Sequence, residues 1–312
     1  MTVNDIVLKT YMNSHWAYHL LAIVIVGIWG VTFINSKVLL LHGLTPHEIF
    51  QLRFIIAYVC IWFISPRKLF ADGWRDELLM MVLGITGGSL YFLAENTAVG
   101  ITYVNNVSFI LCSNPLITTF ISILVLRNLR ATPQLIWGSV IALVGVALVI
   151  YNGSFILHLN PLGDFLALAA AFSWSIYSLL IKRVTGRYSI IFITRKLFFY
   201  GLLTMIPVFL VSPWKFPLEG FRDPVVWMNL AFLGFIASFA CFYLWNVALQ
   251  KIGTIAASNY IYLNPITTMI ASALFLNEPV TSIAFLGCFL ILAGVFWANN
   301  GIEYKNIKQT DL

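Results

Sequence analysis

Residues 96–126 read NTAVGITYVNNVSFILCSNPLITTFISILVL, and residues 246–276 read NVALQKIGTIAASNYIYLNPITTMIASALFL. The two stretches match at a constant offset of 150 residues. Both carry the dipeptide Asn-Pro at the same place, at Asn114-Pro115 and at Asn264-Pro265. Each also ends in a long apolar run of the kind that crosses a bilayer. The matching pair indicates an internal duplication.

The composition places this duplication in a membrane. Hydrophobic residues make up 60% of the 312 residues and charged residues 10%, whereas roughly 25% of a soluble domain is charged. Apolar runs near the ~20 residues of a spanning helix recur along the chain, which predicts an all-α integral membrane protein. We expect ten transmembrane helices, at residues 18–41, 46–64, 78–98, 102–126, 133–151, 163–182, 189–211, 225–247, 253–276 and 280–299.

The repeat extends over five helices in each half. Further matching positions are Trp29 with Trp174, Asn96 with Asn246, Ser108 with Ser258, Gly138 with Gly287, and Gly145 with Gly294. We therefore assign residues 17–151 to a first five-helix repeat and residues 162–299 to a second, with tails at 1–16 and 300–312. Because five is odd, the second copy enters the membrane from the opposite side. Such an inverted repeat is typical of secondary transporters and predicts a substrate site near the midplane.

The basic residues predict the orientation. If the N-terminus is cytoplasmic, twelve lysines and arginines lie in inside segments, two lie in outside loops and four lie within helices. The inside set is Lys9, Arg67, Lys68, Arg75, Arg127, Arg130, Lys182, Arg183, Arg187, Lys251, Lys305 and Lys308, against Lys215 and Arg222 outside. Cytoplasmic loops carry the excess of positive charge. We therefore expect both tails on the cytoplasmic side of the cell (inner) membrane.

Several functional classes lack their residues here. The five histidines lie in termini, connections or helix ends, and neither H-E-x-x-H nor G-x-S-x-G occurs. We therefore predict no enzyme and no catalytic residue. The four cysteines stand singly in apolar runs, so we expect no metal site and no cofactor. The net charge of +6 reflects the loops of a membrane protein and indicates no nucleic acid partner.

Several segments carry a pattern shared with a known family. In the first half they are WGVTFINSKVLL, ENTAV and SNPL; in the second they are GDFLALAAAFSWSIYSLL, NVAL, NPI and LFLNEPVTSIAFLGCFLILAGV. In these segments the chain resembles the EamA-type branch of the drug/metabolite transporter superfamily. The resemblance implies ten helices, a central cavity and movement of small metabolites, often export of amino acids or drug-like molecules. A nucleotide-sugar or phosphorylated-sugar exchanger of the same superfamily, and a non-transporting membrane protein, remain alternatives.

The candidate pathway residues are polar, charged or aromatic side chains within the predicted helices. They are Trp29, Arg53, Glu95, Asn105, Ser108, Asn114, Trp174, Tyr177, Arg195, Tyr243, Tyr262 and Asn264. The aromatic members suit stacking on an organic substrate, but packed or lipid-facing roles explain them as well. The small polar side chains of the fourth helix, spaced by three and four residues, fit a cavity wall or close helix packing. The expected partners are a small-molecule substrate and the lipid bilayer, and the oligomeric state is unknown.

Pro115 and Pro265 are expected in the middle of their helices. A proline has no backbone N–H, so the carbonyls of Leu111 and Ile261 lose their usual helical donor. Such carbonyls are tolerated in a membrane only within protein or beside water. Each proline is therefore either a pivot between two arrangements or a static kink.

Glu95 breaks the symmetry of the repeat, because its counterpart is Trp245. A carboxylate within a membrane helix is costly and usually functional. Three roles stay open: a contact that closes the outer mouth, a substrate or proton site, and an interfacial anchor. Arg53 either extends to the interface or pairs with a carboxylate such as Glu95. Protons are thus a candidate coupling ion, with facilitated diffusion as the alternative.

Overall fold

The computed structural model describes residues 3–65, 68–102, 104–127, 129–151, 160–276 and 281–303. Within these ranges the regular structure is helical, and no strand is present. The first half contains α1 (Val3–Leu41), α2 (Pro46–Ile64), α3 (Trp74–Gly84), η1 (Ile85–Ser89), α4 (Leu90–Ile101), α5 (Val104–Leu111), α6 (Asn114–Phe120), η2 (Ile121–Val125) and α7 (Pro133–Tyr151). The all-α prediction is confirmed.

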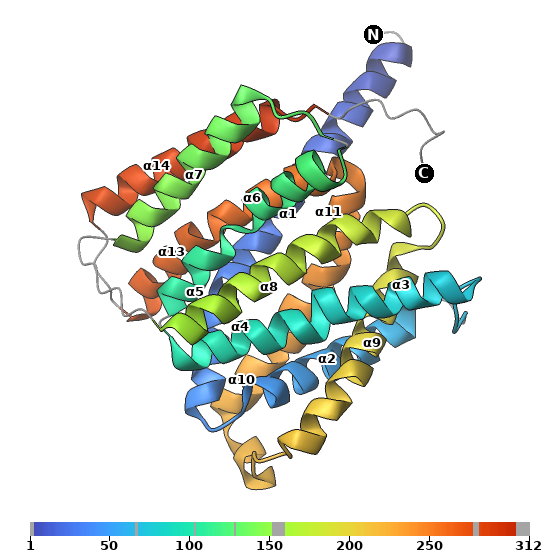
Figure 1. Cartoon of the computed structure of the whole chain (residues 1–312), viewed down its shortest axis with the longest axis vertical. Helices are drawn as coiled ribbons and strands as arrows, with labels where there is room; N and C mark the ends of the chain where they lie inside the picture. The colour runs from blue at the N-terminus through green and yellow to red at the C-terminus, as the bar shows by residue number, and fades with distance from the viewer. Residues whose placement is uncertain are drawn as a thin grey trace.

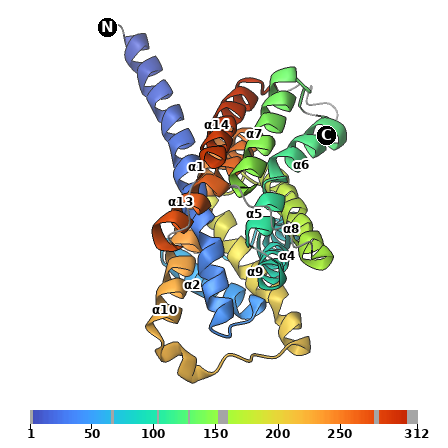
Figure 2. The same cartoon turned by 90° about the vertical axis from the view of Figure 1, so that its left-hand side faces the viewer.

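The second half repeats this series. It contains α8 (Pro161–Leu180), η3 (Ile181–Arg183), α9 (Ile190–Val211), η4 (Leu218–Arg222), α10 (Pro224–Ala231), η5 (Phe232–Ala240), α11 (Cys241–Ile252), α12 (Thr254–Asn259), η6 (Tyr260–Leu263), α13 (Asn264–Leu276) and α14 (Ser282–Asn300). The chain path is shown in Figure 1. Helix α1 is longer than expected, and its N-terminal part extends beyond the rest of the molecule (Figures 1 and 2).

Eight helices of the described chain are long and apolar enough to cross a membrane. A ninth apolar segment, Pro133–Val149, is shorter within the described residues. The Thr254–Leu276 segment corresponds by the repeat to the fourth predicted helix and is interrupted by η6. The protein is thus an integral membrane protein built from two inverted repeats, and the count of ten spans stays a prediction.

Equivalent helices make equivalent contacts. Helix α1 packs on α11 and α13 of the other half, and its counterpart α8 packs on α4 and α6. Two of the three π-helical segments of the described residues are also equivalent, since the offset of 150 residues carries η1 onto residues 235–239 within η5. Each half therefore buries its first helix against the other half's third and fourth predicted spans.

Among the described helices, α7 and α14 make the most extensive contact, and Figure 1 shows them side by side at one edge. The pairing depends on four glycines at matched positions of the two halves. A Cβ at Gly138 would lie 2.4 Å from the backbone nitrogen of Ala298, and a Cβ at Gly145 would lie 2.6 Å from the Gly287 carbonyl oxygen. Small residues allow this approach of two backbones in lipid. The glycines matched by sequence are therefore contact points between the halves.

Candidate functional site

A cavity lies between the two repeats. Its wall draws on α1, α2, α4, α5, α6, α8, α11, η6 and α13, and consists of Trp29, Thr32, Phe33, Arg53, Tyr91, Phe92, Glu95, Leu111, Asn114, Ala171, Trp174, Phe242, Ile261 and Asn264. The cavity volume is about 40 Å³. One water needs roughly 10–15 Å³ by this measure, so the cavity holds a few waters and is too small for an organic metabolite. In this structure the site therefore has no room for a bound metabolite.

Two broken helices border the cavity. The chain turns at Cys112–Ser113 between α5 and α6, and the 3-10 segment η6 separates α12 from α13. Pro115 and Pro265 follow the two breaks. The Cys112 thiol donates a hydrogen bond to the Ile261 carbonyl oxygen (3.7 Å), so the two helix breaks are in contact. Discontinuous helices of this kind surround the midplane sites of transporters.

The first break is attached to α8 through Asn114. The Asn114 amide nitrogen donates to the Ala171 carbonyl (3.0 Å) and to the Ser175 hydroxyl (2.8 Å). At the second break, the Thr268 hydroxyl donates to the Gly30 carbonyl of α1 (2.7 Å). Each break is therefore held by the first helix of the opposite repeat.

Arg53 lies in the cavity wall and is only 1% exposed. Its Nε donates to the Ser238 hydroxyl (2.8 Å), and its guanidinium lies 4.3 Å from the centre of the Phe92 ring. Its Nη1 is buried and has no hydrogen-bond partner among the described residues. Arg53 therefore does not extend to the interface and presents an unpaired donor at the site.

Glu95 lies in the same wall and is 3% exposed. It precedes Ile101, the last residue of α4, by six residues, or about 9 Å at 1.5 Å per residue. Glu95 therefore lies farther from the end of its helix than the roughly 5 Å that follows from the predicted helix end at residue 98. Within the described chain no ion pair shorter than 4.0 Å involves Glu95, although Arg53 and Tyr91 are its polar neighbours.

Two tryptophans matched by the repeat meet at the cavity. The rings of Trp29 and Trp174 lie 5.4 Å apart at 89°, an edge-to-face contact. Trp29 also donates from Nε1 to the Ala237 carbonyl (3.0 Å), whereas Trp174 Nε1 has no partner among the described residues. Tyr91 also belongs to the aromatic part of the wall, and the centre of its ring lies 4.9 Å from that of Trp174.

Five other candidates lie outside the wall, and one is not described. Tyr177 is fully buried and donates to the Asn246 amide oxygen. Ser108 and Tyr262 are buried, and Tyr243 is half-buried. Arg195 contacts the Lys68 carbonyl at one end of the molecule. Asn105 lies in α5, but its side chain is outside the part that the structure describes.

The wall also contains residues that were not among the candidate pathway residues. They are Thr32, Phe33, Tyr91, Phe92, Leu111, Ala171, Phe242 and Ile261. Most are apolar and resemble any lipid-facing residue of a membrane helix. Tyr91 was recognisable, because it precedes Glu95 by four residues and shares its helical face.

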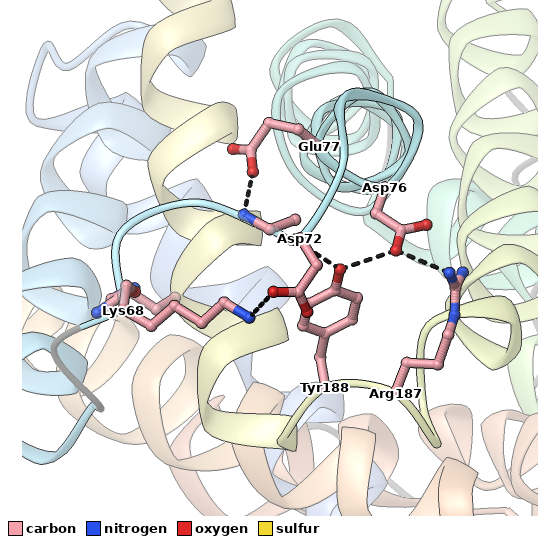
Figure 3. Close-up of polar contacts among 8 residues, drawn as sticks. Lys68, Asp72, Asp76, Glu77, Arg187 and Tyr188 are labelled. Carbon is pink, nitrogen blue, oxygen red and sulfur yellow. Dashed lines mark hydrogen bonds and ion pairs between the residues drawn. The ribbon is translucent and has the colours of Figure 1, made fainter.

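A polar cluster joins the two repeats at one end of the molecule, and we call it the latch (Figure 3). In its outer part, Arg187 and Tyr188 of the α8–α9 connection donate to Asp76 of α3 at 2.7 and 2.8 Å. The Tyr188 hydroxyl also accepts from the Asp72 backbone N–H (2.9 Å). The hydrogen bond from Lys68 holds the pKa of the Asp72 carboxyl below its usual value.

The inner part of the latch centres on Glu77. Its carboxylate accepts from the Ala71 backbone N–H (2.6 Å), from the Lys196 ammonium and from the Tyr200 hydroxyl. Lys196 is only 3% exposed. This ion pair, in which Lys196 is buried and the Glu77 side chain is 20% exposed, fixes α9 of the second repeat to α3 of the first.

The other end of α9 leads to a second contact with the first repeat. Glu48, in the first turn of α2, accepts from the backbone N–H groups of Lys215 (2.5 Å) and Phe216 (2.9 Å). It also accepts from the Thr45 backbone N–H (2.7 Å), which closes the start of α2. Polar contacts thus join the repeats at both ends, with the cavity between them.

An inverted repeat with broken helices and buried opposite charges around a small cavity is typical of membrane transporters. The comparisons with known proteins give the family. The model of the EamA-like transporter family matches residues 16–151 and again 161–300, so this chain belongs to that family.

Curated relatives carry transporter names. A chain from Archaeoglobus fulgidus described as an uncharacterized transporter is 26% identical over 91% of this chain and 97% of its own length. An Escherichia coli chain described as a probable amino-acid metabolite efflux pump is 25% identical over 91% and 95%. One solved crystal structure superposes with a TM-score of 0.70 over 92% of this chain and 96% of the other at 16% identity, which shows a shared fold. The protein is therefore a transporter of this family and not an enzyme.

Proposed function

We propose that the protein exports a small organic metabolite, an amino acid or a drug-like compound, by alternating access through the central cavity. The observation that carries this proposal is the small cavity at two broken helices, with Arg53 and Glu95 buried in its wall. Buried charges in a membrane helix are expensive and mark a transport pathway. The efflux names of two relatives, from Escherichia coli and Salmonella typhimurium, support the direction.

The charges of the cavity argue against a nucleotide-sugar or phosphorylated-sugar exchanger. A phosphate carries close to two negative charges and favours several cationic partners. The described wall offers one cation, Arg53, and it also contains the Glu95 carboxylate. Arg195, the other candidate cation, lies at the latch and not in the wall. An anionic phosphate would therefore meet repulsion as well as attraction.

Alternating access requires that the ends open in turn. The latch closes one end, and the contacts of Glu48 close the other. Opening the latch end would separate Asp76 from Arg187 and expose the cavity on that side. Glu95 is the titratable group in the wall that suits proton coupling, and facilitated diffusion remains the alternative.

The orientation is tested by cysteine labelling. By the positive-inside rule the latch end is cytoplasmic, because Lys68, Arg183 and Arg187 lie there. Glu219 and Arg183 are both exposed. In intact cells, we expect a membrane-impermeant maleimide to label Glu219→Cys strongly and Arg183→Cys only after permeabilisation. The unmodified protein supplies the background, and the reverse labelling pattern would contradict the proposed orientation.

Trp174 provides a test of the pathway itself. Trp174→Phe keeps an aromatic ring but removes the unpartnered Nε1 and part of the wall. In proteoliposomes we expect flux to fall about tenfold, the equivalent of one 1.4 kcal/mol interaction. Trp227→Phe, at a site that is 52% exposed and outside the wall, is the matched control and should transport normally. Equal flux in both variants would place the pathway elsewhere.

A further inference from the structure

We infer that the central cavity binds a zwitterion, with the ligand's carboxylate at Arg53 and its ammonium group at Glu95. This inference rests on the proposed function, because it assigns the substrate chemistry of the same cavity. It assigns the substrate class as compounds that carry both charges, such as α-amino acids, and excludes their singly charged analogues.

The contacts of Arg53 fix its guanidinium in a position where it can bind an anion. Its Nε is occupied by the Ser238 hydroxyl, and the Phe92 ring covers one face of the guanidinium. The side chain is 1% exposed, yet Nη1 has no partner among the described residues. A guanidinium stays charged under all physiological conditions. A buried charged donor without an acceptor is costly, and a ligand carboxylate in the adjoining cavity would supply that acceptor.

Glu95 faces the same cavity as a receptor for a cation. It is 3% exposed, and within the described chain no Lys or Arg nitrogen lies within 4.0 Å of its carboxylate. Arg53 is close enough to interact electrostatically but does not form an ion pair with it. The two opposite charges therefore border one cavity without neutralising each other by contact, which leaves a place for a ligand of two charges.

The uncharged polar atoms of the wall can form hydrogen bonds with both charged groups of a zwitterion. Asn114 Oδ1 and Asn264 Oδ1 are buried acceptors without partners among the described residues, and both residues lie at the helix breaks. An ammonium group has three donors, which the Glu95 carboxylate and these oxygens can accept. Trp174 Nε1 is an unpartnered donor and complements a carboxylate.

A singly charged ligand would leave one buried charge uncompensated. A carboxylic acid would leave Glu95 without a cation, and an amine would leave Arg53 without an anion. Sites built around a polar group reject analogues that lack it by large factors, because the site's own groups stay unpaired. The rest of the wall is apolar or aromatic, including Phe33, Leu111 and Phe242, which favours an uncharged substituent on the zwitterion.

The test uses the full chain in liposomes. Counterflow of a radiolabelled mixture of the twenty L-amino acids is measured first, and then its inhibition by defined compounds. L-phenylalanine and L-leucine are compared with their decarboxylated analogues, 2-phenylethylamine and 3-methylbutylamine, and their deaminated analogues, 3-phenylpropionate and 4-methylpentanoate. We expect the amino acids to inhibit at least about 100-fold more strongly than either analogue. Equal inhibition by the singly charged compounds would overturn the inference.

Variants separate binding from folding. Arg53→Met and Glu95→Gln are each expected to lower flux by about 100-fold, because each removes one charged contact to the ligand. The double variant removes both buried charges, so its melting temperature should recover toward that of the unmodified protein while flux stays low. Recovery of flux in the double variant would show that the charges serve only the fold, and would overturn the inference.

The outcome also distinguishes this inference from the proposed function. If the amino acid mixture gives no counterflow but other metabolites do, the chain is a transporter and the zwitterion site is wrong. The same conclusion follows if flux of an uncharged compound is unaffected by both single variants. If no metabolite is moved, the proposed function itself fails.

Discussion

Gly145→Leu is expected to leave little folded protein. Gly145 packs against the backbone of α14, where a Cβ would lie 2.6 Å from the Gly287 carbonyl oxygen and 2.7 Å from the Ile291 nitrogen. Backbone atoms cannot rotate away as a side chain end can, so the leucine must separate the two helices. Overpacking typically costs 1–3 kcal/mol, and we expect about 3 kcal/mol or more here because the contact is backbone to backbone.

The measurement is thermal unfolding of the purified protein together with the yield of monodisperse material. Gly100→Leu is the matched control, because a Cβ at that exposed helical position meets only the Leu40 side chain at 3.9 Å. The control should unfold close to the temperature of the unmodified protein. If both variants unfold at the same temperature, the α7–α14 contact does not stabilise the fold.

Glu77→Ala is expected to destabilise the protein by about 3–5 kcal/mol, the usual cost of leaving one member of a buried ion pair without its partner. Lys196 would remain 3% exposed without a counter-charge, and Tyr200 and the Ala71 N–H would lose their acceptor. Because the latch joins α3 to α9, the loss should also loosen one end of the cavity. We expect a lower melting temperature of the purified protein.

Two further variants serve as controls for the Glu77→Ala result. Glu77→Met combined with Lys196→Met replaces the pair by apolar side chains and should recover most of the lost stability. Glu303→Ala breaks the Arg130–Glu303 pair, whose side chains are 65% and 58% exposed, and should change stability by about 1 kcal/mol or less. If Glu77→Ala is no more harmful than Glu303→Ala, the latch does not hold the repeats together.

Much of the fold could be predicted because hydropathy and the internal repeat are both read directly along the sequence. The predicted 46–64 and 133–151 segments coincide with α2 and α7, and the duplicated Asn-Pro dipeptides coincide with the two helix breaks. Helix ends are less certain, because apolar residues continue past them. The third predicted span extends to Ile101, three residues beyond the expected end, which places Glu95 deeper in the membrane.

The candidate site was predicted only in part. Four candidates with a repeat partner, Trp29, Trp174, Asn114 and Asn264, are found together in the wall, whereas Ser108, which is also matched by the repeat, lies outside it. No sequence signal distinguishes Tyr177 and Tyr262 from the residues of the wall. In a membrane protein all faces of a helix are apolar, so the hydrophobic pattern does not show which face of the helix points to the cavity. The latch depends on which connections meet in space, and that is set by packing between helices far apart in sequence.

The pairing of α7 with α14 has a consequence for the order in which the protein is made. Helix α7 completes the first repeat, but the glycine face that it presents is matched by the last helix of the chain. Most multidomain proteins fold their N-terminal part first as it leaves the ribosome. The contacts of Gly138 and Gly145 with α14 can therefore form only after the last helix of the chain has been translated. In this respect the second repeat completes the packing of the first.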